Sequence, residues 1–193
     1  MVPPPSFATS SRMAAPWGEL DADEKRQRVL DVAKDVFTDQ GLDATMPRVA
    51  AAAGVGVGSL YRCYGSKEDL VAALVIRQLR LLQAEVSVAA EHGDAWTAIE
   101  RSVRRIAERQ ATNKLLSAAL GLISERRDVV MALGELSLAW QQLIDRARED
   151  GTVRSDATVK DLRFVFAAAR AADEVEPGGR DRILTLLLEA LRR

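Results

Sequence analysis

The sequence has little of what most enzyme and metal sites need: it contains one cysteine, Cys63, and one histidine, His92. A single cysteine excludes an internal disulfide, and a histidine without cysteine or histidine partners offers no metal-ligand cluster. No Ser-His-Asp or His-Cys constellation and no nucleotide-binding loop can be assembled from these residues. The sequence therefore predicts no enzyme, no metal site and no cofactor.

Long apolar runs and aromatic residues are also scarce. No run approaches the ~20 residues that span a membrane, and the N-terminus lacks the charged and apolar regions of a secretory signal, so we expect a cytoplasmic protein. Aromatic residues make up 5% of the chain, whereas alanine and leucine are abundant and the hydrophobic fraction is 48%. This composition favours an all-α fold with a substantial core.

The charge is nearly balanced, with a formal net charge of −1 over 193 residues. Bulk electrostatics therefore give no sign of a nucleic-acid partner. Locally the balance differs, because residues 44–67 contain Arg48, Arg62 and Lys67 and no acidic residue. A modest basic patch on a neutral protein fits a reader of DNA that depends on base contacts and dimer symmetry.

Residues 1–20 are rich in proline, serine and alanine without any period and predict a disordered tail. Arg12 within it is either a solvated residue or an arm that reaches a minor groove. Residues 21–40 predict the first helix, with Asp21 and Glu24 as a capping box.

Two short helices are predicted at residues 46–53 and 57–63. Thr45 is placed as the N-cap of the first, where its hydroxyl can accept a first-turn N–H. Gly54 can take the positive φ that ends that helix. The two segments thus predict a pair of helices joined by a tight glycine turn.

The spacing around Gly54 favours a helix-turn-helix. Ala50 lies four residues before Gly54, where the helices cross closely and need a small side chain. Leu60 lies six residues after it, where an apolar side chain faces the shared core. The second helix would then be a recognition helix for the major groove.

This stretch resembles the DNA-binding signature of the TetR family of transcriptional regulators. The matching residues are Thr45, Val49-Ala50, Ala53-Gly54-Val55, Gly58-Ser59-Leu60-Tyr61, Tyr64 and Ser66-Lys67-Glu68-Asp69-Leu70. Two positions depart from the family pattern. Gly56 stands where serine or threonine is usual, so the recognition helix lacks a side-chain N-cap, and Tyr64 replaces the usual phenylalanine.

The resemblance implies which residues contact a double-stranded DNA operator. Thr45, Tyr61 and Lys67 match positions that hold phosphates, and Arg62 is the candidate for a guanine contact. The full set of predicted DNA-binding residues is Thr45, Arg48, Gly56, Val57, Gly58, Ser59, Tyr61, Arg62, Tyr64 and Lys67.

Six further helices are predicted after the helix-turn-helix, at residues 67–89, 94–110, 113–124, 129–150, 158–173 and 180–192. The chain is thus expected to have about nine helices in two domains, 21–66 for DNA binding and 67–193 as a helical effector-binding and dimerisation bundle.

The resemblance implies a mostly apolar effector pocket in the second domain, with few polar groups. Ordinary core packing of Trp96 and Trp140 is the alternative. The predicted lining residues are Trp96, Ile99, Val103, Gln110, Asn113, Leu136 and Trp140.

The last two helices resemble half of an intermolecular four-helix bundle, although packing wholly within one subunit is also open. The helix at 180–192 is apolar over more than half its circumference and must bury two sides. The predicted dimer-interface residues are Phe166, Ala169, Ile183, Leu187 and Leu191.

The resemblance therefore predicts a homodimeric repressor that a small, largely apolar ligand releases from a pseudo-palindromic operator. The alternatives are a regulator of the same fold without a small-molecule effector, and an activator.

Overall fold

A computed structural model of the chain describes residues 16–91, 93–112 and 115–193. The regular elements of these residues are helices, which confirms the all-α prediction. One isolated β-bridge pairs Val153 with Arg192. The chain forms two compact units, Met1–Leu74 and Val75–Arg193, which divide within the long helix α4 (Lys67–Glu91). No helix in the described ranges combines the length and the apolar character that crossing a membrane requires.

The described chain begins with a short 3-10 helix, η2 (Trp17–Glu19), inside the stretch predicted as a disordered tail. Leu20 is buried, and the ammonium of Lys25 lies 6.0 Å from the centroid of the Trp17 ring. Apolar surface on Trp17 and Leu20 thus orders the chain just before α1. Arg12, the proposed minor-groove arm, lies outside the described residues.

Helix α1 (Ala22–Gln40) begins at the capping box that the sequence predicts. The Asp21 carboxylate accepts the Glu24 N–H at 2.8 Å, and the Asp21 N–H donates to the Glu24 carboxylate at 3.0 Å. Its buried side chains recur at helical spacing and include Val29 and Phe37. This stripe forms one wall of the core of the first unit.

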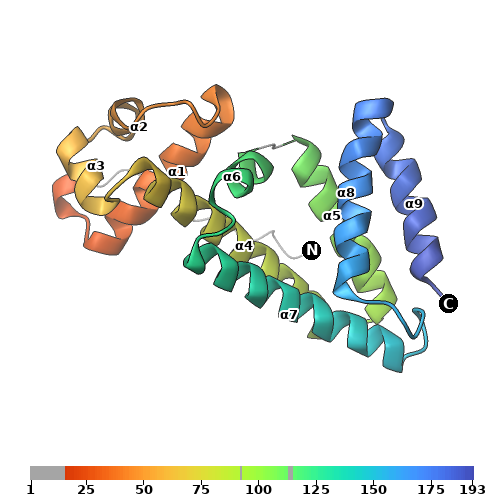
Figure 1. The fold of residues 1–193 in the computed structure, drawn as a ribbon. Helices are drawn as coiled ribbons and strands as arrows, with labels where there is room; N and C mark the ends of the chain where they lie inside the picture. Colours follow the sequence, from red (N-terminus) through yellow and green to blue (C-terminus); the bar gives the residue numbers. More distant parts are fainter. Residues whose placement is uncertain (1–15, 92, 113–114) are drawn as a thin grey trace, which may run out of the picture. The chain divides into compact units, whose positions relative to one another are not determined.

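Helices α2 (Met46–Ala53) and α3 (Val57–Cys63) follow with the predicted bounds. Gly54 takes the left-handed conformation, with φ at 68°, and the Val55 N–H donates to the Ala50 carbonyl at 3.0 Å. Ala50 and Leu60 are both buried, as a close crossing of the two helices requires. The helix-turn-helix of the first unit is therefore formed (Figure 1).

One detail of the predicted helix start is wrong. Thr45 is the N-cap of α2, but its side chain makes no capping hydrogen bond. Pro47 occupies the second helical position and has no N–H, so a donor that an N-cap hydroxyl usually bonds is missing.

The second unit contains the later turns of α4 and five more helices: α5 (Ala95–Thr112), α6 (Leu115–Ile123), α7 (Arg127–Glu149), α8 (Val159–Val175) and α9 (Gly179–Leu191). Their core includes Trp96, Trp140 and Leu188. Helices α8 and α9 lie side by side (Figure 1), and a Cβ added at Gly179 would meet the Ala172 carbonyl oxygen at 2.6 Å.

Backbone bonds fix the end of α9 to the loop before α8. The Arg154 N–H donates to the Leu191 carbonyl at 3.0 Å, and the Arg193 N–H donates to the Thr152 carbonyl at 3.1 Å. The Arg192 guanidinium lies 5.8 Å from the centroid of the Trp96 ring. The C-terminal helix pair is thereby held against α5.

Candidate nucleic-acid interface

Helix α3 has one buried face and one exposed face. Leu60 is fully buried in the core of the first unit, whereas Val57 and Tyr61 are 38% and 45% exposed. Gly56, Gly58 and Arg62 are exposed as well. The exposed face therefore carries two apolar contact groups, one guanidinium and two glycines that let another surface approach the backbone closely.

The Arg62 side chain lies back along α3 towards the start of the helix. Its Nη2 donates to the Ser59 hydroxyl oxygen at 2.7 Å. A Cβ added at Gly58 would lie 3.7 Å from Arg62 Nη1. The guanidinium is thus held over the first turn of the helix, which is the end of a recognition helix that meets bases in a major groove.

The flanking helices add two more basic side chains. Arg48 is exposed on α2, and its Nε donates to Gln40 Oε1 at the end of α1, at 3.4 Å. Lys67 begins α4, directly after Ser66, whose hydroxyl oxygen accepts the Asp69 N–H at 3.0 Å. Together with the exposed Thr45, these residues supply donors for an anionic backbone around the α3 face.

Tyr64 is placed differently from the other predicted contact residues. Its side chain is 8% exposed, and its hydroxyl donates to the backbone carbonyl of Arg26 on α1 at 3.0 Å. The residue therefore packs within the first unit and connects the end of α3 to α1.

Four residues predicted to line a ligand pocket lie in the core of the second unit. Trp96, Ile99, Val103 and Trp140 are all buried. A cavity beside Trp96 and Ile99 has a volume of about 10 Å³. This is at most the space for one water molecule, so the side chains in the structure pack as core.

The remaining predicted pocket residues are more varied. The Gln110 Oε1 is buried and has no hydrogen-bond partner among the described residues. Leu136 is partly buried against the core, and Asn113 lies outside the described residues. A buried acceptor without a donor costs free energy.

The residues predicted to form a dimer interface divide into two groups. Ala169 and Leu191 are 2% and 8% exposed and belong to the core of their own subunit. Phe166, Ile183 and Leu187 are partly buried against the same core. The sequence reasoning missed the most exposed apolar residues of α8 and α9, which are Phe164, Val175 and Leu186.

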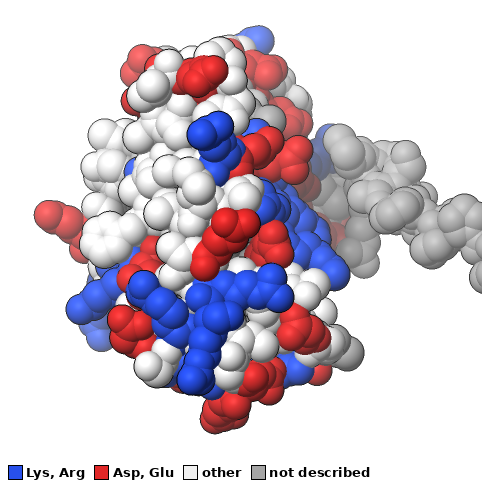
Figure 2. All heavy atoms as spheres, turned by 90° about the vertical axis from the view of Figure 1, so that its right-hand side faces the viewer, with Lys and Arg blue, Asp and Glu red and all other residues white. Residues whose placement is uncertain are grey.

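The side of the second unit that carries α8 and α9 includes a weakly charged area. Figure 2 views the side where α8 and α9 lie in Figure 1, and it shows a broad uncharged area bordered by clustered basic and acidic residues. Phe164 is 71% exposed, which is unusual for a phenylalanine side chain. The sequence contained a signal for this face of α8. Phe164 lies four residues before the alanine at 168 and eleven before Val175, and this spacing places the three side chains on one side of a helix.

Two family models match the chain. The model described as "Bacterial regulatory proteins, tetR family" matches residues 29–74, and that described as "Transcriptional regulator SbtR-like, C-terminal domain" matches residues 93–193. The first match covers the helix-turn-helix, and the second covers more than half of the chain.

Similar proteins extend the match over the whole length. The HTH-type transcriptional repressor KstR2 of Rhodococcus jostii is 29% identical over 208 aligned positions, covering 99% of this chain and 94% of that protein. The crystal structure of a TetR transcription regulatory protein from Mycobacterium vanbaalenii has a TM-score of 0.67 at 26% identity, covering 90% of this chain and 98% of that one. The TetR transcriptional regulator SCO0520 of Streptomyces coelicolor gives a TM-score of 0.65 at 28% identity, with coverage of 86% and 98%.

Proposed function

The chain belongs to the TetR family of transcriptional regulators, and we propose that it is a homodimeric repressor of a pseudo-palindromic DNA operator. The observation that carries the proposal is the exposed face of α3, with Val57 and Tyr61 outward and Leu60 buried. The similarity to a curated repressor along nearly the full length supports repression over activation.

The proposed DNA contacts divide into two kinds. Arg62 donates to a guanine edge, because its guanidinium lies over the first turn of α3 and can exchange the Ser59 hydroxyl for base acceptors. Thr45, Arg48 and Lys67 hold phosphates and fix the register of the protein on the duplex. Gly56 and Gly58 let the backbone approach closely.

We propose that α8 and α9 form the dimer interface. Phe164, Val175 and Leu186 expose apolar surface on these two helices. Burying this surface against a second copy is favourable, and two-fold symmetry would present two α3 helices to successive turns of DNA, ~34–36 Å apart.

We propose that a small, largely apolar ligand regulates the protein by releasing it from its DNA operator. The buried and unpartnered Oε1 of Gln110 supports a polar anchor at one end of α5. Such a ligand must bind the DNA-incompetent state more tightly than the DNA-bound state. The cavity of about 10 Å³ beside Trp96 favours the second candidate, a regulator of this fold without a small-molecule effector in that place.

The test is selection of operator DNA by the purified full chain. Fragmented genomic DNA from the source organism is incubated with the protein, and the bound fragments are recovered and footprinted. We expect enrichment of short inverted repeats with protected half-sites. Recovery of fragments in proportion to the input would contradict sequence-specific binding.

A further inference from the structure

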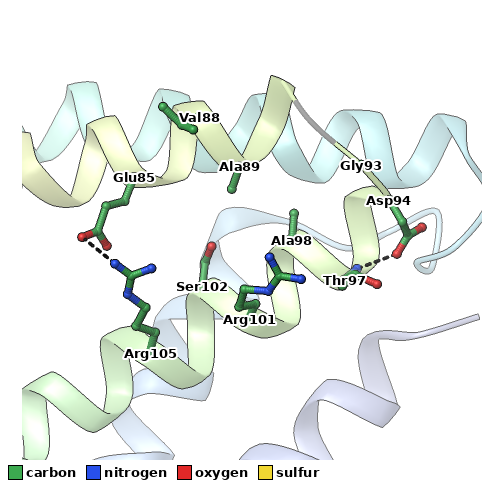
Figure 3. A pocket seen from close by; sticks show the side chains of 10 residues that line it. All are labelled: Glu85, Val88, Ala89, Gly93, Asp94, Thr97, Ala98, Arg101, Ser102 and Arg105. Atoms are coloured by element: carbon green, nitrogen blue, oxygen red, sulfur yellow. Dashed lines mark hydrogen bonds and ion pairs between the residues drawn. The ribbon is translucent and has the colours of Figure 1, made fainter. Parts of the chain in front are cut away.

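A groove lies between the last turns of α4 and the first three turns of α5, away from the predicted effector pocket. It has a volume of about 420 Å³, and Figure 3 shows the side chains that line it. This volume is within the range of small-molecule sites. Its lining residues are Glu85, Val88, Ala89, Gly93, Asp94, Thr97, Ala98, Arg101, Ser102 and Arg105.

Both acidic side chains of the groove are already engaged. Glu85 accepts from Arg109 at 2.9 and 3.0 Å and from Arg105 at 3.4 Å, so two guanidinium groups share one carboxylate. Asp94 accepts the Thr97 N–H at 2.6 Å, and hydrogen bonding from Thr97 lowers the pKa of Asp94. The charge of Glu85 is therefore paired with two arginines, whereas Asp94 keeps its negative charge at the Gly93 end of the groove.

The groove also contains hydrogen-bond donors that are not fully used within the protein. Arg101 is exposed, and its guanidinium forms no ion pair or hydrogen bond with the residues that the structure describes. The Ser102 hydroxyl points from α5 towards α4, and Arg105 lies one turn beyond Arg101 on the same helix (Figure 3). The Arg101 guanidinium, the Ser102 hydroxyl and the N–H groups of Arg105 that do not bond Glu85 match an acceptor-only group such as a carboxylate.

The other side chains that face the groove are apolar and small. Val88 is 60% exposed, and Ala89 and Ala98 face each other from α4 and α5 (Figure 3). Beside the groove, the Arg146 guanidinium of α7 donates to the carbonyl oxygens of Ala90 and Gly93. The groove therefore combines an apolar floor with a rim of mixed charge, on which Arg101 is the arginine without an acidic partner among the described residues.

We propose that this groove binds a small amphipathic carboxylate. Arg101 and Arg105 hold the carboxylate, with the Ser102 hydroxyl as a further donor, and the apolar body lies on Val88, Ala89 and Ala98. None of the residues predicted for the effector pocket lines this groove. The site is a property of the second unit, so binding there does not depend on the proposed DNA function.

The proposal is tested by isothermal titration of the full chain, without DNA, with 4-phenylbutyrate. Its uncharged and cationic counterparts, 4-phenylbutanol and 4-phenylbutylamine, and inorganic phosphate are the comparison ligands. We expect the carboxylate to bind at least about tenfold more tightly than each of the three, because only it combines a negatively charged pair of acceptor oxygens with an apolar body. Equal binding of any comparison ligand, or no binding of the carboxylate up to about 10 mM, would overturn the proposal.

Matched variants locate the site. Arg101→Gln removes the free guanidinium and should weaken carboxylate binding about tenfold, whereas Arg127→Gln removes an exposed arginine at the start of α7 and should leave it unchanged. Ala98→Phe fills the groove and should abolish binding while circular dichroism shows the same helix content. Equal weakening by the two arginine variants, or full binding by a folded Ala98→Phe protein, would show that the groove is not the site.

Discussion

The Tyr64 hydroxyl donates a hydrogen bond to the backbone carbonyl of Arg26, with 3.0 Å between the two oxygens. These residues are 38 positions apart, at the end of α3 and in the second turn of α1. The bond fixes the helix that we propose contacts DNA to the helix that supports it. We infer that Tyr64 acts on DNA binding through the orientation of α3.

Tyr64→Phe tests this inference. The ring remains and the hydrogen bond is lost, so the free energy of unfolding should fall by about 0.5–1.5 kcal/mol, measured by urea denaturation. Tyr61→Phe is the matched control, because the Tyr61 side chain is 45% exposed and its change should leave stability unaltered. A loss of operator affinity by Tyr64→Phe at unchanged stability would instead make Tyr64 a direct DNA contact.

Arg62 and Arg48 should differ in what they contribute to DNA binding. Arg62→Ala should lower operator affinity by about 1–3 kcal/mol and relax the preference at one base pair. Arg48→Ala should weaken binding to all operator variants alike and reduce the salt dependence of the affinity. Fluorescence anisotropy with single-base operator variants at several salt concentrations separates the two patterns. An Arg62→Ala protein that keeps the wild-type ranking of variants would contradict the base contact.

The α8–α9 pair depends on a glycine at position 179. In Gly179→Ala the new methyl would begin 2.6 Å from the Ala172 carbonyl oxygen, so the backbone must shift, at a cost of about 1–3 kcal/mol. Gly134 lies within α7 with open space around it, and Gly134→Ala should stabilise the protein by roughly 0.5–1 kcal/mol. Thermal unfolding of the two variants measures the contrast, and a neutral Gly179→Ala would show that the helix pair is not tightly packed there.

Among the proposed interface residues, substitution of Phe164 should weaken the dimer most. Phe164→Glu places a charge on the proposed interface and should raise the dimer dissociation constant at least about thirtyfold in sedimentation equilibrium. Leu138→Glu is the control, since Leu138 is 66% exposed on α7, outside the proposed interface. Dissociation by Leu138→Glu with an intact Phe164→Glu dimer would place the interface elsewhere.

Local signals in the sequence predicted most of the first unit. The capping box at Asp21 and the glycine at 54 act within one turn of chain, so their structural effect can be predicted without knowing the rest of the fold. The Thr45 hydroxyl makes no capping bond, although Pro47 removes only one of the two N–H groups that it could accept and the Arg48 N–H remains.

The second unit was harder to predict, because its helices have apolar residues on more than one side. Periodicity identifies those sides but does not say which one faces the core of the same subunit. Ala169 and Leu191 were therefore predicted at the dimer interface although they are buried within the subunit, and the exposed Phe164 was missed. The groove beside Arg101 depends on which guanidinium groups find a carboxylate, and only the three-dimensional arrangement of α4 and α5 determines that.

The central claim is that two α3 helices, presented by one dimer, bind DNA in a sequence-dependent way. The most direct measurement compares the affinity of the purified dimer for its selected operator, for the same operator with about five base pairs inserted between the half-sites, and for random duplex at one salt concentration. The account predicts that the operator binds about a thousandfold or more tightly than random DNA, and that the half-turn insertion removes most of this preference. Equal affinity for the three duplexes would contradict it.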